Sequence, residues 1–404
     1  MRENCTYGSM RGSRRKTAKS GLRVVADRAG VPYGASRSTL HPMEVSVTRT
    51  GRKELEMSLT SLSIHNFRGL QNFESDRFSR ITLIGGKNNS GKSSVLEAAY
   101  YLSGMSNPAI TIQLNGMRTM GMTHISSLYP LFYAKDTSKS ISICGKFSDK
   151  VQRSLIVETY APAKVYVTGE ALRFNSNVRG KRWLRQSFKR TPSGGGDEVG
   201  ISLIEEDENG RMLVRTPKAY KEHWKAVFDS VRTPAHPILW LDSLAHMGKI
   251  ESVVKWLAML EKRVSDIRHL EGDEVIVKFD GIEKPLPLQV MGDGMIKALT
   301  IAAEALYVGE KGLVCIDEIE NGLHYSTMER VWAFIVERAR EGTQFLITTH
   351  NMEIMKRLAA TQDLSEKGLF SYLNIYRETG DIVRAYPHSW EEFVGSLEAG
   401  MEIR

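Results

Sequence analysis

The segment Gly86–Ser93, with the sequence GKNNSGKS, constrains the fold of this chain more than any other feature. It satisfies the pattern G-x-x-x-x-G-K-[ST], whose glycines let the backbone curl so that successive N–H groups point inward and form an anion site. The short apolar run Ile81–Ile84 precedes it, and Ser93–Leu102 follows with apolar residues at helical spacing. A strand, a glycine-rich turn and a helix in this order predict a phosphate-binding loop in an α/β fold.

The chain outside its middle part continues this alternation of strands and helices, which predicts a mostly parallel sheet with helices on both faces. The expected strands are Leu59–Ile64, Leu313–Ile316, Gln344–Thr348, Leu373–Arg377 and Ile382–Tyr386, and the expected helices lie near Lys249–Arg263, Gly294–Val308, Ser326–Arg340 and Trp390–Leu397.

The middle of the chain has a different pattern. Ser140–Phe147 and Leu155–Tyr160 are typical of strands, and Ile201–Glu206 and Arg211–Thr216 flank an Asn-Gly hairpin signal. We therefore expect one nucleotide-binding domain at 57–404, with an inserted β-rich lobe at about 105–235.

Residues 1–56 resemble a basic tail, because residues 1–53 hold 12 Lys and Arg against 3 Asp and Glu and show no sustained period. A disordered tail and an over-long start before Met57 both explain this composition, and a targeting peptide fits less well because an apolar core is missing. The remaining residues are close to neutral. Three scattered cysteines and the lack of a membrane-length apolar run favour a cytoplasmic location.

Several polar residues near the loop and at strand ends have the chemistry of phosphate transfer. Lys92 suits the β and γ phosphates of ATP, and Ser93 offers a hydroxyl to Mg²⁺. Asp317 and Glu318 end an apolar strand, where carboxylates face the crevice in which ligands bind. Asp317 suits the Mg²⁺ shell, Glu318 suits a general base, and His350, at the end of the next strand, suits a γ-phosphate contact.

Five motifs, taken in chain order, resemble those of ABC-type ATPases. Gly86–Ser93, Met291–Met295, Asp317–Glu318, Glu320–His324 and His350 look like the Walker A loop, signature, Walker B, D-loop and switch histidine. The resemblance implies an ABC-type P-loop NTPase fold, ATP and Mg²⁺ as cofactors, and a homodimer or higher homo-oligomer whose signature closes over the ATP of the other subunit.

The opening Leu62–Leu70, with its Phe-Arg pair, is similar to the first strand of the overcoming-lysogenisation-defect (OLD) family and of SMC- and RecF-type heads, among the AAA_15 and AAA_21 ATP-binding proteins. The resemblance covers about residues 57–390. The resemblance implies that Ser93 and Asp317 bind the metal ion and that Glu318 and His350 are catalytic. It also implies that the nucleotide is bound by Arg68, Gly86, Asn88, Asn89, Ser90, Gly91, Lys92, Ser93, Ser94, Gly292, Asp293 and Gly294.

Three departures from the family pattern bear on function. Met291 stands where the signature usually has Ser, which predicts slower or differently gated hydrolysis. A Q-loop glutamine is not evident, and Gln113 and Gln152 are both candidates. Only 54 residues follow His350, too few for the TOPRIM nuclease domain of OLD proteins.

These features predict an ATPase that, as an ATP-stabilised dimer, controls a separate effector such as a nuclease or TOPRIM-like protein, in a bacterial anti-phage or toxin-like system. The alternatives are a DNA-repair or chromosome-maintenance head and a slowly hydrolysing scaffold. The stretch Arg173–Arg190 is basic with interleaved aromatics, which suits nucleic acid as well as a solvated or partner-contacting loop. We expect no membrane contact.

Overall fold

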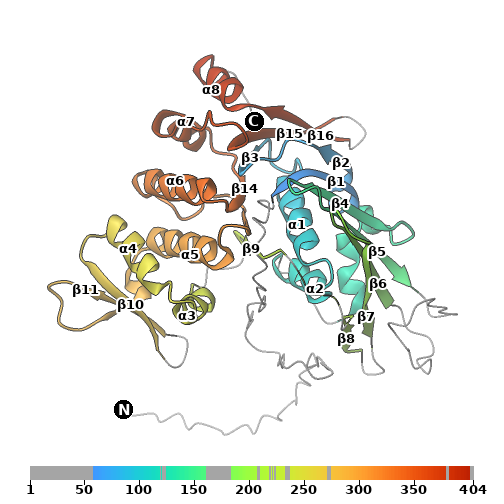
Figure 1. Ribbon diagram of the computed structural model, residues 1–404, viewed down its shortest axis with the longest axis horizontal. Coiled ribbons are helices and arrows are strands. Elements are labelled where there is room, and N and C mark those ends of the chain that lie inside the picture. Colours follow the sequence, from blue (N-terminus) through green and yellow to red (C-terminus); the bar gives the residue numbers. More distant parts are fainter. Residues whose placement is uncertain are drawn as a thin grey trace, which may run out of the picture.

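A computed structural model describes most of the chain from Ser58 onward (Figure 1). The expected tail at 1–56 and the first part of the expected basic loop, 173–182, lie outside the described residues. The described residues are 58–118, 120, 124–160, 183–206, 210–217, 220, 222, 224–232, 237–270, 274–378 and 382–400.

A six-stranded sheet carries the predicted phosphate loop. Its strands run in the order β16-β15-β3-β14-β13-β9, and all neighbours are parallel except β15 and β16. This confirms the mostly parallel sheet expected from strand-helix alternation. The strands are β3 (Ile81–Gly85), β9 (Ala226–Asp229), β13 (Leu313–Ile316), β14 (Gln344–Thr348), β15 (Phe370–Arg377) and β16 (Val383–His388).

Helices cover both faces of this sheet (Figure 1). Alternate residues of β13 divide between the faces, since Val314 and Ile316 join the core formed with α5, α6 and α7, whereas Leu313 and Cys315 join the core formed with α1. Every helix within the described ranges is too short or too polar to cross a lipid bilayer. The helices are α1 (Lys92–Ser103), α2 (Ala109–Gly116), α3 (Ile238–His246), α4 (Ile250–Leu260), α5 (Asp293–Val308), α6 (Tyr325–Arg340), α7 (Met352–Thr361) and α8 (Trp390–Glu398).

A seven-stranded antiparallel sheet lies on the far side of α1 and has the order β2-β1-β4-β5-β6-β7-β8. Its inner face packs on α1 and α2, and Gln344 of β14 ties it to the parallel sheet by bonding both backbone groups of Leu59 at 2.8 Å. The strands are β1 (Leu59–Phe67), β2 (Leu70–Ser75), β4 (Ile141–Phe147), β5 (Gln152–Tyr160), β6 (Trp183–Thr191), β7 (Glu198–Glu206) and β8 (Met212–Arg215).

The strands within the expected lobe at 105–235 do not form a sheet of their own. Its strands continue the sheet that β1 and β2 begin, so β1 is not part of the parallel sheet. β9 lies within the expected lobe but pairs in parallel with β13. A three-stranded sheet next to α3 and α4 was not expected, because its strands are short and polar on one face; they are β10 (Val264–Leu270), β11 (Glu274–Phe279) and β12 (Leu286–Pro287).

The described part of the expected basic loop is a strand rather than an exposed loop. β6 lies between β5 and β7, and its cations face acids on these neighbours or on the turn between β6 and β7. Arg185 pairs with Glu158 of β5, and Lys189 lies 2.6 Å from Asp197. Arg190 pairs with Glu198 at 3.0 Å. The cations of this stretch that the structure describes, Arg185, Lys189 and Arg190, are therefore each paired with an acid. The expectation of an exposed loop fails for this part because the pairing acids, Glu158, Asp197 and Glu198, lie outside the basic stretch itself.

Glu304 is a buried acid in α5, with 3% of its surface exposed. Burial raises its pKa well above the ordinary value of 4.5, the charge of Asp229 raises it further, and Lys297 opposes the shift. The unfolded chain releases this proton near pH 4.5 while the folded chain retains it, so stability falls as the pH rises from there through the folded-state pKa.

Glu304→Gln preserves the shape of the protonated acid and removes this pH-dependent loss. We expect thermal melts at pH 8 to show a Tm about 3 °C or more above wild type. The difference should shrink toward pH 4.5. An unchanged or lower Tm at pH 8 would contradict the buried, protonated state of this side chain.

Candidate active site

The turn between β3 and α1 has no room for side chains at its glycines. A Cβ at Gly85 would collide with the Tyr372 ring of the neighbouring strand, and one at Gly86 would collide with the Ile375 carbonyl. Gly86 and Gly91 have φ values of 136° and 108°, in the region that favours glycine. The backbone therefore wraps tightly around the start of α1, as an anion-binding loop requires.

Lys92, the first residue of α1, lies across the mouth of this loop. Its Nζ donates to the carbonyl oxygens of Gly86 at 2.8 Å and Lys87 at 2.9 Å. Burial lowers the pKa of Lys92, and the nearby Glu318 opposes that shift most strongly. The Ser90 hydroxyl is buried in the same loop without a hydrogen-bond partner among the described residues. The inward cation and the orphaned hydroxyl fit a phosphate group.

Asp317 and Ser93 meet at the carboxyl edge of the parallel sheet. The Ser93 hydroxyl donates to Asp317 Oδ1 at 2.9 Å, and the Thr348 hydroxyl donates to the same oxygen at 2.7 Å. A serine hydroxyl and a carboxylate beside a phosphate loop are the oxygen donors that Mg²⁺ prefers. The structure thus brings together the two residues predicted to hold this ion, although they lie 224 positions apart.

Glu318 has a backbone conformation that only a constrained site retains. Its φ of 51° lies in the left-handed region, which is costly for a residue with a side chain. Its N–H donates to the Thr348 hydroxyl at 2.7 Å, which holds this turn. The half-buried carboxylate has no hydrogen-bond or ion-pair partner within the described ranges. It is therefore available to accept a proton, as predicted for the general base.

His350 is held from the segment that follows Glu318. The Glu320 carboxylate accepts from the His350 backbone N–H at 3.0 Å and lies 3.1 Å from its Nδ1. The imidazole itself is 45% exposed at the sheet edge. Contact of one ring nitrogen with a carboxylate orients the ring and leaves the other nitrogen for a ligand.

The signature-like segment Met291–Met295 lies at the start of α5, on the face of the sheet opposite α1 (Figure 1). A Cβ at Gly294 would press on the carbonyl of Gly322, so the segment packs closely against the D-loop-like turn. A Cβ at Gly292 would meet nothing within 4 Å, and Met291 is buried in the core. The sheet therefore separates Gly292–Gly294 from Lys92 of the same chain.

Arg68 lies in a buried cluster beside α1 rather than in the loop. It donates to Glu97 at 2.8 Å, to Asn115 at 3.1 Å and to the Leu114 carbonyl at 2.8 Å. Desolvation lowers the pKa of Arg68, and Glu97 opposes the shift. These contacts tie the β1–β2 turn to α1 and α2, so the structure gives Arg68 a packing role and does not bring it to the phosphate loop.

The remaining predicted contacts divide between the loop and its surroundings. Asn88 and Asn89 are exposed at the tip of the loop, and Asn89 has a φ of 64°. Ser94 is buried on α1, where its hydroxyl accepts from Arg118 at 3.4 Å. Asp293 is the first residue of α5 and lies beside Gly292. Ser94 therefore supports the loop from within the helix, while the asparagines face solvent.

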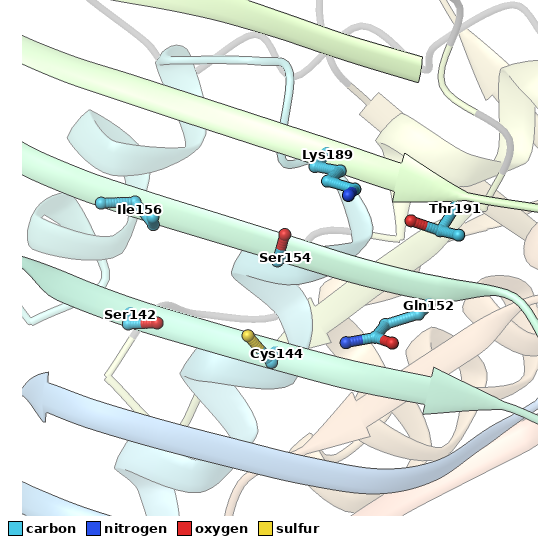
Figure 2. Close-up of a pocket in the computed structure, with 7 residues that line it drawn as sticks. All are labelled: Ser142, Cys144, Gln152, Ser154, Ile156, Lys189 and Thr191. Atoms are coloured by element: carbon cyan, nitrogen blue, oxygen red, sulfur yellow. The ribbon is translucent and has the colours of Figure 1, made fainter. Parts of the chain in front are cut away.

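Neither candidate for the Q-loop glutamine lies at the site edge. Gln113 on α2 accepts from the Tyr100 hydroxyl at 3.2 Å. Gln152 begins β5 and lines a shallow hollow on the outer face of the antiparallel sheet, together with Ser154 and Lys189 (Figure 2). The edge position beside Asp317 belongs instead to Asp229, the last residue of β9, whose carbonyl accepts from the Asp317 N–H at 2.9 Å.

Three residues at the site had no predicted contact, although Glu320 was placed in the D-loop-like segment. Thr348 bonds both Asp317 and Glu318, Glu320 holds His350, and Asp229 supports Asp317. Thr348 and Asp229 each end a short apolar run, so a polar residue at a strand end was the available signal. β9 is only four residues long, however, and its sequence alone does not show that it joins the parallel sheet.

Comparison with known proteins yields relatives of low identity. The chain is 25% identical over 329 residues to an ATP/GTP phosphatase of Helicobacter pylori, covering 74% of this chain and 87% of that protein. It is 24% identical over 170 residues to ABC transporter A family member 10 of Arabidopsis thaliana, covering 40% and 18%.

Solved structures of low similarity include the SMC head domain from Thermotoga maritima, with 15% identity, a TM-score of 0.38 and coverage of 82% of this chain and 100% of that one. The Smc head domain with an extended coiled coil bound to the C-terminal domain of ScpA, derived from Pyrococcus furiosus, has 15% identity, a TM-score of 0.44 and coverage of 85% and 99%.

A family model matches residues 81–356, more than half of the chain, and spans the phosphate loop, the signature-like segment, the acidic strand end and His350. Its description is "AAA domain, putative AbiEii toxin, Type IV TA system". The matched range also contains β3, β13 and β14, which form the centre of the parallel sheet. The chain is therefore a P-loop NTPase that belongs to this AAA-domain family.

Proposed function

We propose that this protein hydrolyses ATP to ADP and phosphate. The observation that carries the proposal is the convergence of three groups at one sheet edge: a phosphate loop with an inward Lys92, the Ser93–Asp317 pair, and the unpartnered carboxylate of Glu318. The similarity to an ATP/GTP phosphatase supports the same reaction.

The residues of the site divide the chemistry among them. Lys92 and the loop N–H groups bind the β and γ phosphates of ATP. Ser93 and Asp317 would hold Mg²⁺, which neutralises negative charge on the phosphates when bound. Glu318 accepts the proton of the attacking water, and His350, oriented by Glu320, donates a hydrogen bond toward the γ-phosphate.

The active unit in this proposal is a two-fold dimer that ATP stabilises. Gly292–Gly294 begins α5, so its N–H groups and the helix dipole form a second anion site. The sheet separates this site from Lys92 of the same chain, whereas a second copy can present it. Each ATP would then lie between the loop of one subunit and the signature of the other.

Mixing two inactive variants tests this arrangement. Lys92→Ala damages the loop, and Gly292→Asp places a negative charge at the second anion site, where the open space accepts a side chain. Heterodimers retain one intact composite site of two, so a random equal mixture should recover about one quarter of wild-type ATPase activity.

The controls are each variant alone, which should be inactive, and Gly292→Ala, which adds a side chain without charge. A mixture that stays inactive although subunits exchange would contradict action in trans.

We further propose that the ATPase controls a separate effector protein, in a toxin-like or anti-phage setting. The family description, which names a putative toxin of a Type IV toxin-antitoxin system, supports this assignment. ATP can control a partner only if the open and closed ATPase bind it with different affinity.

Co-purification with the product of a neighbouring gene tests effector control. We expect binding that changes between ATP and ADP and is altered in Glu318→Gln. The purified chain alone should show no nuclease activity. Cleavage of DNA or RNA by the isolated wild type, without ATP and lost in an Asp317 variant, would show that the chain is its own effector.

A further inference from the structure

A buried ion pair connects α5 to β9. Lys297 Nζ lies 2.6 Å from Asp229 Oδ2, and the two side chains are only 9% and 3% exposed. Taking both charges out of water is costly, and apolar residues of similar volume often stabilise such a position equally well or better. Stability alone therefore does not account for this pair.

The two ends belong to the two halves of the proposed ATP site. Lys297 lies one turn after Asp293 and Gly294 on α5, the helix that presents the second anion site. Asp229 ends β9, and its carbonyl accepts from the Asp317 N–H at 2.9 Å. One ion pair and one backbone hydrogen bond thus connect α5, the signature helix, to Asp317 beside the phosphate loop.

A third ionisable group lies near the pair. Glu304 lies two turns after Lys297 on α5 and is also buried. Burial and the charge of Asp229 raise the pKa of Glu304, and its side chain bonds Trp240 of α3. Burial therefore favours the uncharged form of Glu304, and the ion pair that the structure shows joins Lys297 to Asp229.

We propose that Lys297 and Asp229 are positioning residues that couple the signature end of α5 to Asp317 and Glu318. The inference rests on the proposed ATP hydrolysis across a dimer. Nucleotide of the other subunit binds at Gly292–Gly294 and orders the start of α5. Lys297 and Asp229 then hold the end of β13, with Asp317 and Glu318, in the position that hydrolysis requires. Hydrolysis is therefore fast only when the dimer is closed.

The double variant Asp229→Asn/Lys297→Met tests the coupling, because it removes the ion pair without leaving an unpaired buried charge. We expect kcat for ATP to fall about tenfold, whereas ATP affinity by calorimetry stays within about twofold of wild type. Thermal melts should show a folded protein. Lys297→Arg, which retains the charge, should keep most of the activity. Wild-type kcat in the folded double variant would overturn the proposal.

The pair between Arg153 and Glu222 provides a matched control. It is 2.7 Å long with side chains 0% and 5% exposed, but it joins β5 to the segment before β9, away from the signature helix. Arg153→Met/Glu222→Gln should leave kcat unchanged. An equal fall of kcat in both double variants would reduce the effect to lost packing and overturn the coupling. A wild type that binds ATP without hydrolysing it would sink the proposed function itself.

Discussion

Replacing Glu318 by Gln is expected to leave ATP binding intact and to lower turnover by about 10²- to 10⁴-fold, the range of general base catalysis. The amide has nearly the shape of the carboxylate but cannot accept the proton of the attacking water. The left-handed backbone at this position is held by Thr348 through the N–H, which the substitution leaves in place. Steady-state phosphate release and calorimetric ATP binding, measured on the same preparation, separate the two effects.

Glu310→Gln is the matched control for this experiment. Glu310 is exposed before the other end of β13, far from the carboxyl edge that carries the site. Its amide variant should turn over ATP like wild type. If Glu318→Gln also keeps wild-type turnover, another group activates the water and the assignment of the base is wrong. A trapped ATP-bound dimer in Glu318→Gln would in addition provide the closed state for partner-binding experiments.

Replacing Lys92 by Ala is expected to weaken ATP binding by roughly 100-fold or more, because charge-assisted hydrogen bonds to two phosphates are lost. Lys92 donates to the Gly86 and Lys87 carbonyls, so its ammonium group points into the loop. Calorimetry with ATP and Mg²⁺ measures the loss directly, and hydrolysis should disappear with binding.

Lys87→Ala separates this effect from a general loss of positive charge. Lys87 lies in the same loop, but its side chain is exposed and only its carbonyl contacts Lys92. We expect its affinity for ATP to change less than about tenfold, as for an exposed charge in water. Equal losses in the two variants would mean that Lys92 has no special place in the loop, and unchanged affinity in Lys92→Ala would remove the phosphate-site assignment.

The local elements of the site were predictable because short-range patterns specify them. The strand before Gly86–Ser93, its glycines and the following helix are adjacent in sequence, and Gly86 and Gly91 have positive φ values that favour glycine. β13 and β14 have the bounds that their apolar runs predicted, and α5 and α6 begin within one residue of expectation. The acidic end of β13 follows from the same rule, since the carboxyl ends of buried parallel strands face ligands.

Other features depended on partners that lie outside the segment whose pattern suggested them. The sequence of β6 suggested a free basic surface, yet its cations meet Glu158, Asp197 and Glu198 in the folded chain. Arg68 is part of a motif that resembles nucleotide-binding heads, yet Glu97 and Asn115 bind its side chain in a buried cluster. Charge in a linear sequence does not show which acids or helices will cover it, because burial is decided by the packing of whole layers.

The sequence by itself determined the phosphate loop, the order of the motifs that follow it and the class of sheet that presents them. Only the tertiary structure decided that β1 joins an antiparallel sheet, that the four-residue β9 completes the parallel one, and that Asp229 supports Asp317 from there. The physical reason is that loop geometry and helix periodicity are local properties of the chain. Strand pairing is instead chosen by contacts between segments far apart in sequence, where burial against α1 and α5 selects the partner.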